Sequence, residues 1–471
     1  MTSRLFRTKP MAQIMAETQV EGHKLRRALT AWDLTAIGIG CIIGVGIFVL
    51  PGVQAAKNAG PGIILSFAIA SLACACSALC YAELAAMIPV SGSAYTYGYA
   101  TLGEIFGWII GWDLILEYMV AAVLVATGWS AYFVNLLRNG LGIRVPQALS
   151  ASPFDKQPGL FNLPAVAIVL LISWLLVRGI KESSRVNLTI VIVKVSIILF
   201  FIVATVGHVD PAKWRPFLPF GFKGVMTAAA IVFLAYVGFD AISTTAEEAR
   251  NPQRDLPVGI IASLAVATVL YMIVAAIMTG TVPYKDLGVA DPIALVLNTL
   301  HMPWASALIS VGAIAGITSV LLVLIMGQPR ILFAMSRDGL LPPFLSNVHR
   351  VHKTPHISTW MTGGIVAVAA ALTPIDVSSE LCSIGTLFAY IIVAAGVIVL
   401  RYSKPGLRRP FRTPLSPVLP AVGISLCGYL MASLPPVTWA RFLVWLAIGL
   451  AIYFGYSLRS SALHKSPAAN G

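Results

Sequence analysis

The stretch GIGCIIGVGIF, residues 38–48, decides how the first apolar segment of this 471-residue chain folds, because it contains four glycines. In a helix interior each glycine costs roughly 0.5–1 kcal/mol relative to alanine. Such a density indicates a helix that breaks, or one whose backbone another group approaches closely. The alternative is plain helix packing, since Gly40 and Gly44 form the G-x-x-x-G spacing that lets membrane helices approach. A dinucleotide-binding loop is a poor fit, because no strand pattern precedes the glycines.

The composition places this segment in a membrane. Hydrophobic residues make up 58% of the chain and charged residues only 11%, which is too little polar surface for a soluble protein of this length. We therefore predict an all-α polytopic membrane protein. Twelve apolar stretches are long enough to cross a bilayer: 34–50, 62–88, 105–137, 162–180, 186–207, 224–245, 258–282, 304–332, 358–373, 381–401, 415–434 and 437–457.

The basic residues predict the orientation. With both termini in the cytoplasm, 22 of the 32 Lys and Arg residues fall on the cytoplasmic side, nine fall outside and Lys194 lies within the membrane. The net charge of +13 is then mostly an orientation signal in a cell inner membrane. It requires no nucleic acid partner, and the lipid bilayer is the expected surrounding.

Cysteine and histidine give no sign of a metal centre. The six cysteines all lie in apolar stretches without a C-x-x-C pair, so we expect them to be packing residues. The seven histidines fall in loops or tails, which argues against an intramembrane metalloenzyme. We expect neither a metal nor an organic cofactor.

The sixth apolar stretch, IVFLAYVGFDAISTTAEEARNP, repeats the oddity of the first, with Gly238 in mid-helix before Asp240. Two interrupted segments five helices apart are typical of transporters built from two inverted halves. The predicted organisation is a cytoplasmic tail (1–33), a first repeat (34–207), a second repeat (208–401), a cytoplasmic linker (402–414), two accessory helices (415–457) and a cytoplasmic tail (458–471).

Unwound backbone inside a bilayer is tolerated only where protein buries it or a cavity hydrates it. The N–H groups at Gly44, Val45 and Gly46 are then able to hold a carboxylate, with help from the helix dipole. Freed carbonyls near Phe233, Ala235 and Tyr236 are able to accept from an ammonium group. This pairing fits an α-amino acid, and other zwitterions almost as well.

Lys194, in NLTIVIVKVSIILF, is the one basic residue in the middle of an apolar stretch, where a charge costs roughly 2.5–3.5 kcal/mol on insertion scales. A lysine near a helix end would extend its side chain to the surface, but Lys194 lies about 10 Å along the axis from Asn187. We predict that Lys194 braces the broken helix and carries the coupling proton.

Three acids accompany this lysine. Asp113 and Glu117, spaced i, i+4, share one face of their helix. A hydrolytic carboxylate pair is disfavoured, because nothing else supplies such a site. Glu117 either faces the transport cavity or makes a polar helix contact, while Glu83, near the cytoplasmic end, is expected to pair with a loop arginine.

The chain resembles the amino acid–polyamine–organocation superfamily of permeases, and within it the bacterial members of the cationic amino acid transporter family. The resemblance rests on GIGCIIGVGIFVLPG, YAELAAMIPVSGSAYTYGYATLGE, GWDLILEY, FLAYVGFDAISTTAEEARNPQRDLPVGI and QPRILFAMSRDGLLP. It implies a LeuT-like fold of two inverted five-helix repeats plus two helices. It also implies uptake of amino acids driven by protons.

Residue by residue, the resemblance places the substrate-binding glycine segment on Ile43, Gly44, Val45 and Gly46, and the unwound part of the sixth span on residues 233–240. The family's span-5 lysine falls on Lys194, and the position that sets side-chain size falls on Ile317. Isoleucine leaves no room for arginine there, which favours small or medium neutral amino acids. Glu117 and Asp240 favour cationic ones instead.

Two alternatives remain beside the proton-coupled symporter. An amino-acid exchanger would use Lys194 only as a brace, and a membrane sensor would bind the ligand without carrying it. An enzyme is not expected, and the sequence leaves the oligomeric state open. We further predict that bulky residues at Gly44 or Gly46 abolish binding, whereas alanine at Gly38 is mild.

Overall fold

The computed structural model describes most of the chain. The residues described are 7–8, 27–90, 93–140, 142–154, 158–289, 292–373, 375–432, 434 and 436–465. The predicted N-terminal tail lies largely outside them, as do the last six residues of the predicted C-terminal tail.

Helices make up the whole fold, and the described residues contain no β-strand. The helices are α3 (Ala31–Ile42), α4 (Val45–Phe48), α5 (Leu50–Gln54), α6 (Ile63–Met87), α7 (Ala94–Thr101), α8 (Glu104–Gly140), α9 (Leu163–Arg178), α10 (Ile180–Thr205), α11 (Gly221–Val232), α12 (Ala241–Thr244), α13 (Pro252–Thr281), α14 (Pro292–Thr299), α15 (Pro303–Arg337), α16 (His356–Leu372), α17 (Ile375–Ser403), α18 (Val418–Ala432), α19 (Pro436–Ile452), α20 (Leu458–Ser460) and α21 (Ala462–Lys465).

Among the described residues, eight helices are long and apolar enough to cross a membrane. Four shorter apolar helices, α3, α9, α16 and α18, coincide with the first, fourth, ninth and eleventh predicted crossings. The 16 residues of α9 extend only about 24 Å, less than the hydrocarbon core of roughly 30 Å. The all-helical, polytopic class is therefore confirmed, whereas twelve crossings stay a prediction.

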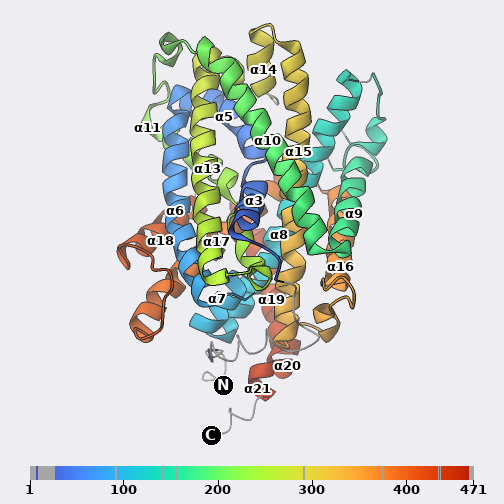
Figure 1. Cartoon of the computed structure of the whole chain (residues 1–471), viewed down its shortest axis with the longest axis vertical. Coiled ribbons are helices and arrows are strands. Elements are labelled where there is room, and N and C mark those ends of the chain that lie inside the picture. The colour runs from blue at the N-terminus through green and yellow to red at the C-terminus, as the bar shows by residue number, and fades with distance from the viewer. Residues whose placement is uncertain are drawn as a thin grey trace.

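The interrupted first segment lies in the middle of the helix bundle. Figure 1 shows α3 among the long helices, and α3 packs against α10, α13 and α15. At the side of the bundle α18 packs on α6 and α17, while α9 and α16 pair with each other. All six cysteines are buried and unbridged, as their predicted packing role requires. The first break is thus enclosed by other helices.

The start of α3 is fixed by local chemistry and by one long-range contact. Thr30 accepts a hydrogen bond from the N–H of Asp33, whose carboxylate accepts from the N–H of Thr30. This reciprocal capping satisfies two N–H groups at the helix start. Just before it, Leu29 forms an isolated parallel bridge with Ala249, beyond α12. The entrance to the first broken segment is thereby tied to the exit of the second.

Candidate functional site

The first apolar segment breaks at Ile43 and Gly44. The helix α3 ends at Ile42, Ile43 is extended with φ −80° and ψ 98°, and α4 begins at Val45. Among the described residues, no backbone carbonyl accepts from the N–H of Gly44. Val45 and Gly46 open α4, so their N–H groups have no acceptor within that helix. The predicted break is confirmed, and it leaves N–H groups without a helical acceptor at the residues that the sequence indicated.

The sixth apolar segment breaks where Gly238 predicts. The helix α11 ends at Val232, and a 3₁₀ turn covers Phe233–Tyr236. Gly238 has a φ of +120°, a conformation that residues with a Cβ rarely adopt, and Asp240 directly precedes α12. The predicted interruption over residues 233–240 is confirmed, and glycine is required at its sharpest turn.

The two breaks lie against each other. A Cβ atom added to Gly46 would come within 2.6 Å of the Cβ of Ala235. One added to Gly238 would come within 2.5 Å of the Sγ of Cys41 in α3. Both distances are shorter than carbon or sulfur contacts allow, so glycine is needed for this close approach. The tertiary structure therefore joins the two interrupted segments into one site.

Tyr271 of α13 connects the two breaks. Its hydroxyl oxygen lies 2.7 Å from the carbonyl oxygen of Ile42 and 2.9 Å from that of Ala235. Its single proton serves one of these acceptors at a time. The Ala235 carbonyl, expected to be free for an ammonium group, is therefore shared with Tyr271. Tyr236 points elsewhere, since its hydroxyl donates to the carbonyl of Phe67 in α6.

Lys194 of α10 is fully buried beside the first break. Its Nζ lies 3.0 Å, 2.9 Å and 2.7 Å from the carbonyl oxygens of Ile39, Gly40 and Ile43, and 2.6 Å from the Oγ of Ser319. An ammonium group has three protons for these four oxygens. The surface-directed alternative is wrong, and the lysine braces the broken helix as predicted. Its role in proton coupling stays a prediction.

Asp240 lies on the other side of the second break, buried among aromatic hydroxyls. The hydroxyl of Tyr118 in α8 donates to Oδ2 of Asp240 at 2.9 Å, and the hydroxyl of Tyr390 in α17 lies 3.5 Å from Oδ1. The ring of Phe233 packs edge-on against Tyr390, with centroids 6.1 Å apart. Asp240 thus links the second break to two helices outside it.

Asp113 and Glu117, two of the three acidic residues of α8, are buried. Thr386 of α17 donates to Oε1 of Glu117 at 2.7 Å, while Oε2 has no hydrogen-bond partner. Neither carboxyl oxygen of Asp113 has one. Asp240 interacts electrostatically with Glu117, and no cationic side chain of the described residues pairs with Asp113, Glu117 or Asp240. Glu117 therefore makes a polar contact with α17 through Oε1, while its position at the transport cavity stays a prediction.

One turn of α15 packs against the first break. Ile317 is fully buried there, and a Cβ added to its neighbour Gly316 would lie 3.8 Å from the carbonyl oxygen of Ile43. One turn further on, the Cγ2 of Val320 would lie 2.7 Å from a Cβ added to Gly44. Val320, which the sequence did not single out, therefore limits the space beside the exposed N–H groups.

The structure contradicts the prediction that alanine at Gly38 is mild. A Cβ there would lie 2.5 Å from the Oγ of Ser263 and 2.6 Å from the Cδ1 of Ile242. At Gly40 it would lie 2.7 Å from the Oδ1 of Asn187. Both glycines serve helix packing, and the packing is too close for an extra methyl group.

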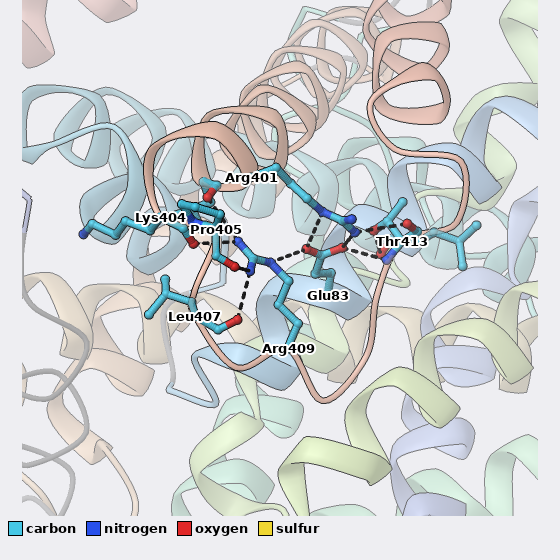
Figure 2. Close-up of polar contacts among 9 residues, drawn as sticks. Glu83, Arg401, Lys404, Pro405, Leu407, Arg409 and Thr413 are labelled. Atoms are coloured by element: carbon cyan, nitrogen blue, oxygen red, sulfur yellow. Dashed lines mark hydrogen bonds and ion pairs between the residues drawn. The ribbon is translucent and has the colours of Figure 1, made fainter.

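Glu83 of α6 holds two arginines, which confirms its predicted pairing (Figure 2). Its Oε2 lies 2.7 Å from Nη2 of Arg401, and its Oε1 lies 3.3 Å from Nε of Arg409. The N–H of Thr413 donates to Oε2 as well, at 2.6 Å. The guanidinium of Arg409 also donates to the carbonyls of Leu400, Lys404, Pro405 and Leu407. The predicted linker is thereby fastened to the end of α6.

Two further ion pairs tie the segment after α12 to the last third of α15. Glu248 lies 2.6 Å from Nε of Arg330, and Glu247 lies 3.0 Å from Nη2 of Arg337. All four side chains are almost completely buried. The two ion pairs therefore fix this end of the second broken segment to α15, the helix that also packs on the first break.

A sequence model described as amino acid permease matches residues 29–456, a range that contains both breaks, Lys194 and the buried acids. The chain belongs to the amino acid permease family. The resemblance to the amino acid–polyamine–organocation superfamily is thereby confirmed.

Relatives of the permease include two proteins of Bacillus subtilis (strain 168). It is 51% identical to the branched-chain amino acid permease BcaP over 468 residues, which cover 99% of this chain and 100% of BcaP. It is 48% identical to the methylthioribose transporter over 463 residues, covering 98% and 100%. The vacuolar cationic amino acid transporter 2 of Arabidopsis thaliana is 38% identical over 419 residues, covering 88% and 65%. These relatives are transport proteins, which confirms that the permease is not an enzyme.

Several residues of the site are not marked by any spacing pattern in the sequence. Tyr271, Ser319, Val320 and Thr386 are single residues within long apolar helices, and nothing in their spacing sets them apart. Their importance comes from contacts with segments far away in the chain. A lone tyrosine in the run ATVLYMIVAA was the one hint available, because a buried phenol usually has a hydrogen-bond partner.

Proposed function

We propose that the permease is a proton-coupled symporter of small to medium neutral L-amino acids, working by alternating access around its two broken helices. Twelve crossings in a LeuT-like arrangement, five plus five inverted and two accessory, fit the two breaks and their separation by five helices. The observation that carries the proposal is the contact of Lys194 with three carbonyls at the first break.

The constant part of an amino acid fits the joined breaks. Its carboxylate would take the N–H groups of Gly44, Val45 and Gly46, for which the structure supplies no acceptor at Gly44. Its ammonium group would lie toward the second break, where Asp240 and the carbonyls of the 3₁₀ turn offer acceptors. The two ends of the zwitterion are thus bound by two different broken segments, and substrate would stabilise their closure.

The side chain of the substrate would meet α15. Ile317 and Val320 are both branched and buried on the turn that faces the first break. They leave less space than small residues would, which disfavours arginine. The likeness to BcaP, a branched-chain amino acid permease, supports neutral substrates of medium size. Asp113 and Glu117, buried without a cation among the described residues, support the cationic alternative.

Proton coupling would act through the brace. When Lys194 carries its proton, its ammonium group holds the carbonyls of Gly40 and Ile43. Loss of the proton removes one N–H donor, so the carbonyls at the end of α3 lose one of the hydrogen bonds that stabilise the break. Because the same break exposes the N–H of Gly44, protonation and substrate binding would stabilise one conformation together.

Uptake into proteoliposomes tests the coupling. We expect the wild-type permease to accumulate substrate when an acidic outside pH is imposed. Lys194→Ala should lose this response, while exchange of labelled for unlabelled substrate persists. If uptake by Lys194→Ala still follows the pH gradient, the assignment is wrong. An amino-acid exchanger would show exchange but no gradient-driven uptake in the wild type, and a sensor would show neither.

A substrate panel separates the remaining possibilities. Thermal shift and uptake with all common amino acids, at two pH values, should give the largest responses for alanine and the branched-chain residues. Methylthioribose belongs in the panel, because a relative that is 48% identical is named for it. Responses confined to arginine, lysine and ornithine would overturn the argument from Ile317.

A further inference from the structure

A pocket with both polar and apolar walls lies in the loop between α15 and α16, away from the broken helices. It has a volume of about 640 Å³, and its walls include Ser346, Asn347, His349, Arg350 and His356. In Figure 1 the end of α16 that adjoins this loop lies toward the same end of the molecule as both chain termini. The predicted orientation places this end in the cytoplasm. Nothing in the proposed transport cycle uses the pocket.

The loop that forms the pocket is held in place by hydrogen bonds. The hydroxyl of Ser358 in α16 donates to the carbonyl of Leu345 at 2.6 Å. The hydroxyl of Thr354 donates to the carbonyl of Val177 at the end of α9, at 3.1 Å. The N–H of His349 donates to the carbonyl of Thr354 at 2.8 Å, which closes the loop on itself. The pocket is thus preformed.

The loop that forms the pocket carries charge of one sign. No Asp or Glu occurs between Asp338 and Asp376 in the sequence, whereas Arg350, Lys353 and three histidines do. Among the described residues, no carboxylate pairs with Arg350 or Lys353. Arg178, next to the Val177 carbonyl that Thr354 contacts, adds a further cation at the end of α9. An anion is therefore the ligand that this surface attracts.

The histidines supply donors rather than a metal site. Nδ1 of His349 accepts from the N–H groups of Val351 and His352, both at 3.2 Å, so its ring proton is on Nε2. Loss of hydration, followed by repulsion from His352 and His356, lowers the pKa of His349, in keeping with this neutral form. Nδ1 of His356 is buried and has no hydrogen-bond partner. A ligand in the pocket would therefore contact His356 through Nε2, because Nδ1 is not accessible from the pocket.

The surroundings of the pocket are apolar on the membrane side. Trp360, Ile365 and Val368 of α16 are exposed, and so is Phe344 beside the pocket. In a membrane helix, exposed apolar side chains face lipid tails. A ligand with an anionic head and apolar tails would therefore meet cationic and donor groups in the pocket and apolar surface along α16.

We propose that this pocket binds the phosphate of an anionic phospholipid head group, with the acyl chains along α16. Arg350 in the wall and Lys353, three residues further along the same loop, supply charge, while Ser346, Asn347 and His356 in the wall supply hydrogen-bonding groups. The site is distinct from the transport site, since Lys194 and the two breaks contribute nothing to it.

Thermal unfolding of the purified permease in detergent tests this site. Phosphatidylglycerol should raise the unfolding temperature, and phosphatidylcholine, whose head group carries no net charge, should not. In the double variant Arg350→Gln, Lys353→Gln we expect the apparent affinity for phosphatidylglycerol to fall roughly tenfold or more. Arg408→Gln removes an exposed cation from the linker, outside the pocket, and should respond as the wild type does.

Three outcomes would overturn the proposal. Equal stabilisation by both lipids would mean that charge is not recognised. An unchanged response in the double variant would place the lipid elsewhere. A shift with inorganic phosphate alone, lost in the double variant, would assign the pocket to the free ion instead of a lipid. His356→Gln, expected to weaken lipid binding with amino-acid uptake unchanged, separates failure here from failure of the proposed transport function.

Discussion

At the residue scale, two features of the structure bear on Gly44 at once. Its N–H lacks a backbone acceptor among the described residues, and the space where a Cβ would lie is filled by Val320. For Gly38 and Gly40 only the lack of space applies. A Cβ atom would collide with a side chain of α13 at Gly38 and with one of α10 at Gly40. Four glycines that look alike in sequence therefore serve different purposes, because the neighbours that they face come from different helices.

A size-compensation experiment tests the role of Gly44. In Gly44→Ala the new methyl group collides with Val320, so we expect substrate affinity to fall at least severalfold. Val320→Ala removes the colliding methyl groups, and the double variant should recover part of the affinity. Isothermal titration with the best substrate of the panel measures both steps. Equal affinity in Gly44→Ala and the wild type would show that the close approach of Val320 to Gly44 does not limit binding.

At the element scale, the broken helices are held by their neighbours more than by their own hydrogen bonds. α10 supplies Lys194 to the first break, and α13 supplies the Tyr271 hydroxyl to both. Unwound backbone in a bilayer needs such partners, since each unpaired carbonyl would cost several kcal/mol. The unbroken helices therefore act as the scaffold that stabilises the unwound backbone at the two breaks.

The buried pair of Glu248 and Arg330 should stabilise the closed end of the second broken segment. Glu248→Gln leaves Arg330 without its counter-charge in a buried position, which costs about 3–5 kcal/mol. We expect a clearly lower unfolding temperature for this variant. The double variant Glu248→Gln, Arg330→Met removes the uncompensated charge and should recover much of the loss. Identical unfolding of the single variant and the wild type would contradict this view.

Glu83 should control how firmly the linker is attached. Glu83→Gln removes the charge shared by Arg401 and Arg409, so the linker should open more often and trypsin should cleave after Arg408 and Arg412 severalfold faster. Limited proteolysis followed by mass spectrometry gives the rate at each site. Asp286→Asn, an exposed acid far along the chain, is the matched control. Cleavage at the wild-type rate would mean that the other contacts of the linker suffice.

At the scale of the whole molecule, sidedness is open to a direct test. The six native cysteines are buried, which makes a single exposed cysteine a clean reporter. Phe154 and Val351 are 74% and 79% exposed and are predicted to lie on opposite sides. An impermeant maleimide should label Phe154→Cys in intact cells, and Val351→Cys only after permeabilisation. Labelling of both in intact cells would reject the predicted orientation.

The sequence was sufficient for the features that depend on local composition. Hydropathy located the long helices of the bundle, because a membrane segment has to be apolar along its length. Both breaks were predictable from glycine in the middle of an apolar stretch, and the buried lysine from the cost of its charge. An arginine partner was expected for Glu83 because an unpaired carboxylate in an apolar segment is costly.

The tertiary structure alone decided which groups meet. It placed Tyr271 between the two breaks, Val320 against Gly44 and Ser319 beside Lys194, none of which spacing along a single helix reveals. It also reversed the expectation for Gly38, whose neighbours Ser263 and Ile242 lie more than 200 positions away in the chain. Apolar patterning depends only on the residues of one segment, so it can be read from the sequence of that segment. Hydrogen bonds and close contacts between segments depend on how the helices pack together, and only the folded bundle fixes that.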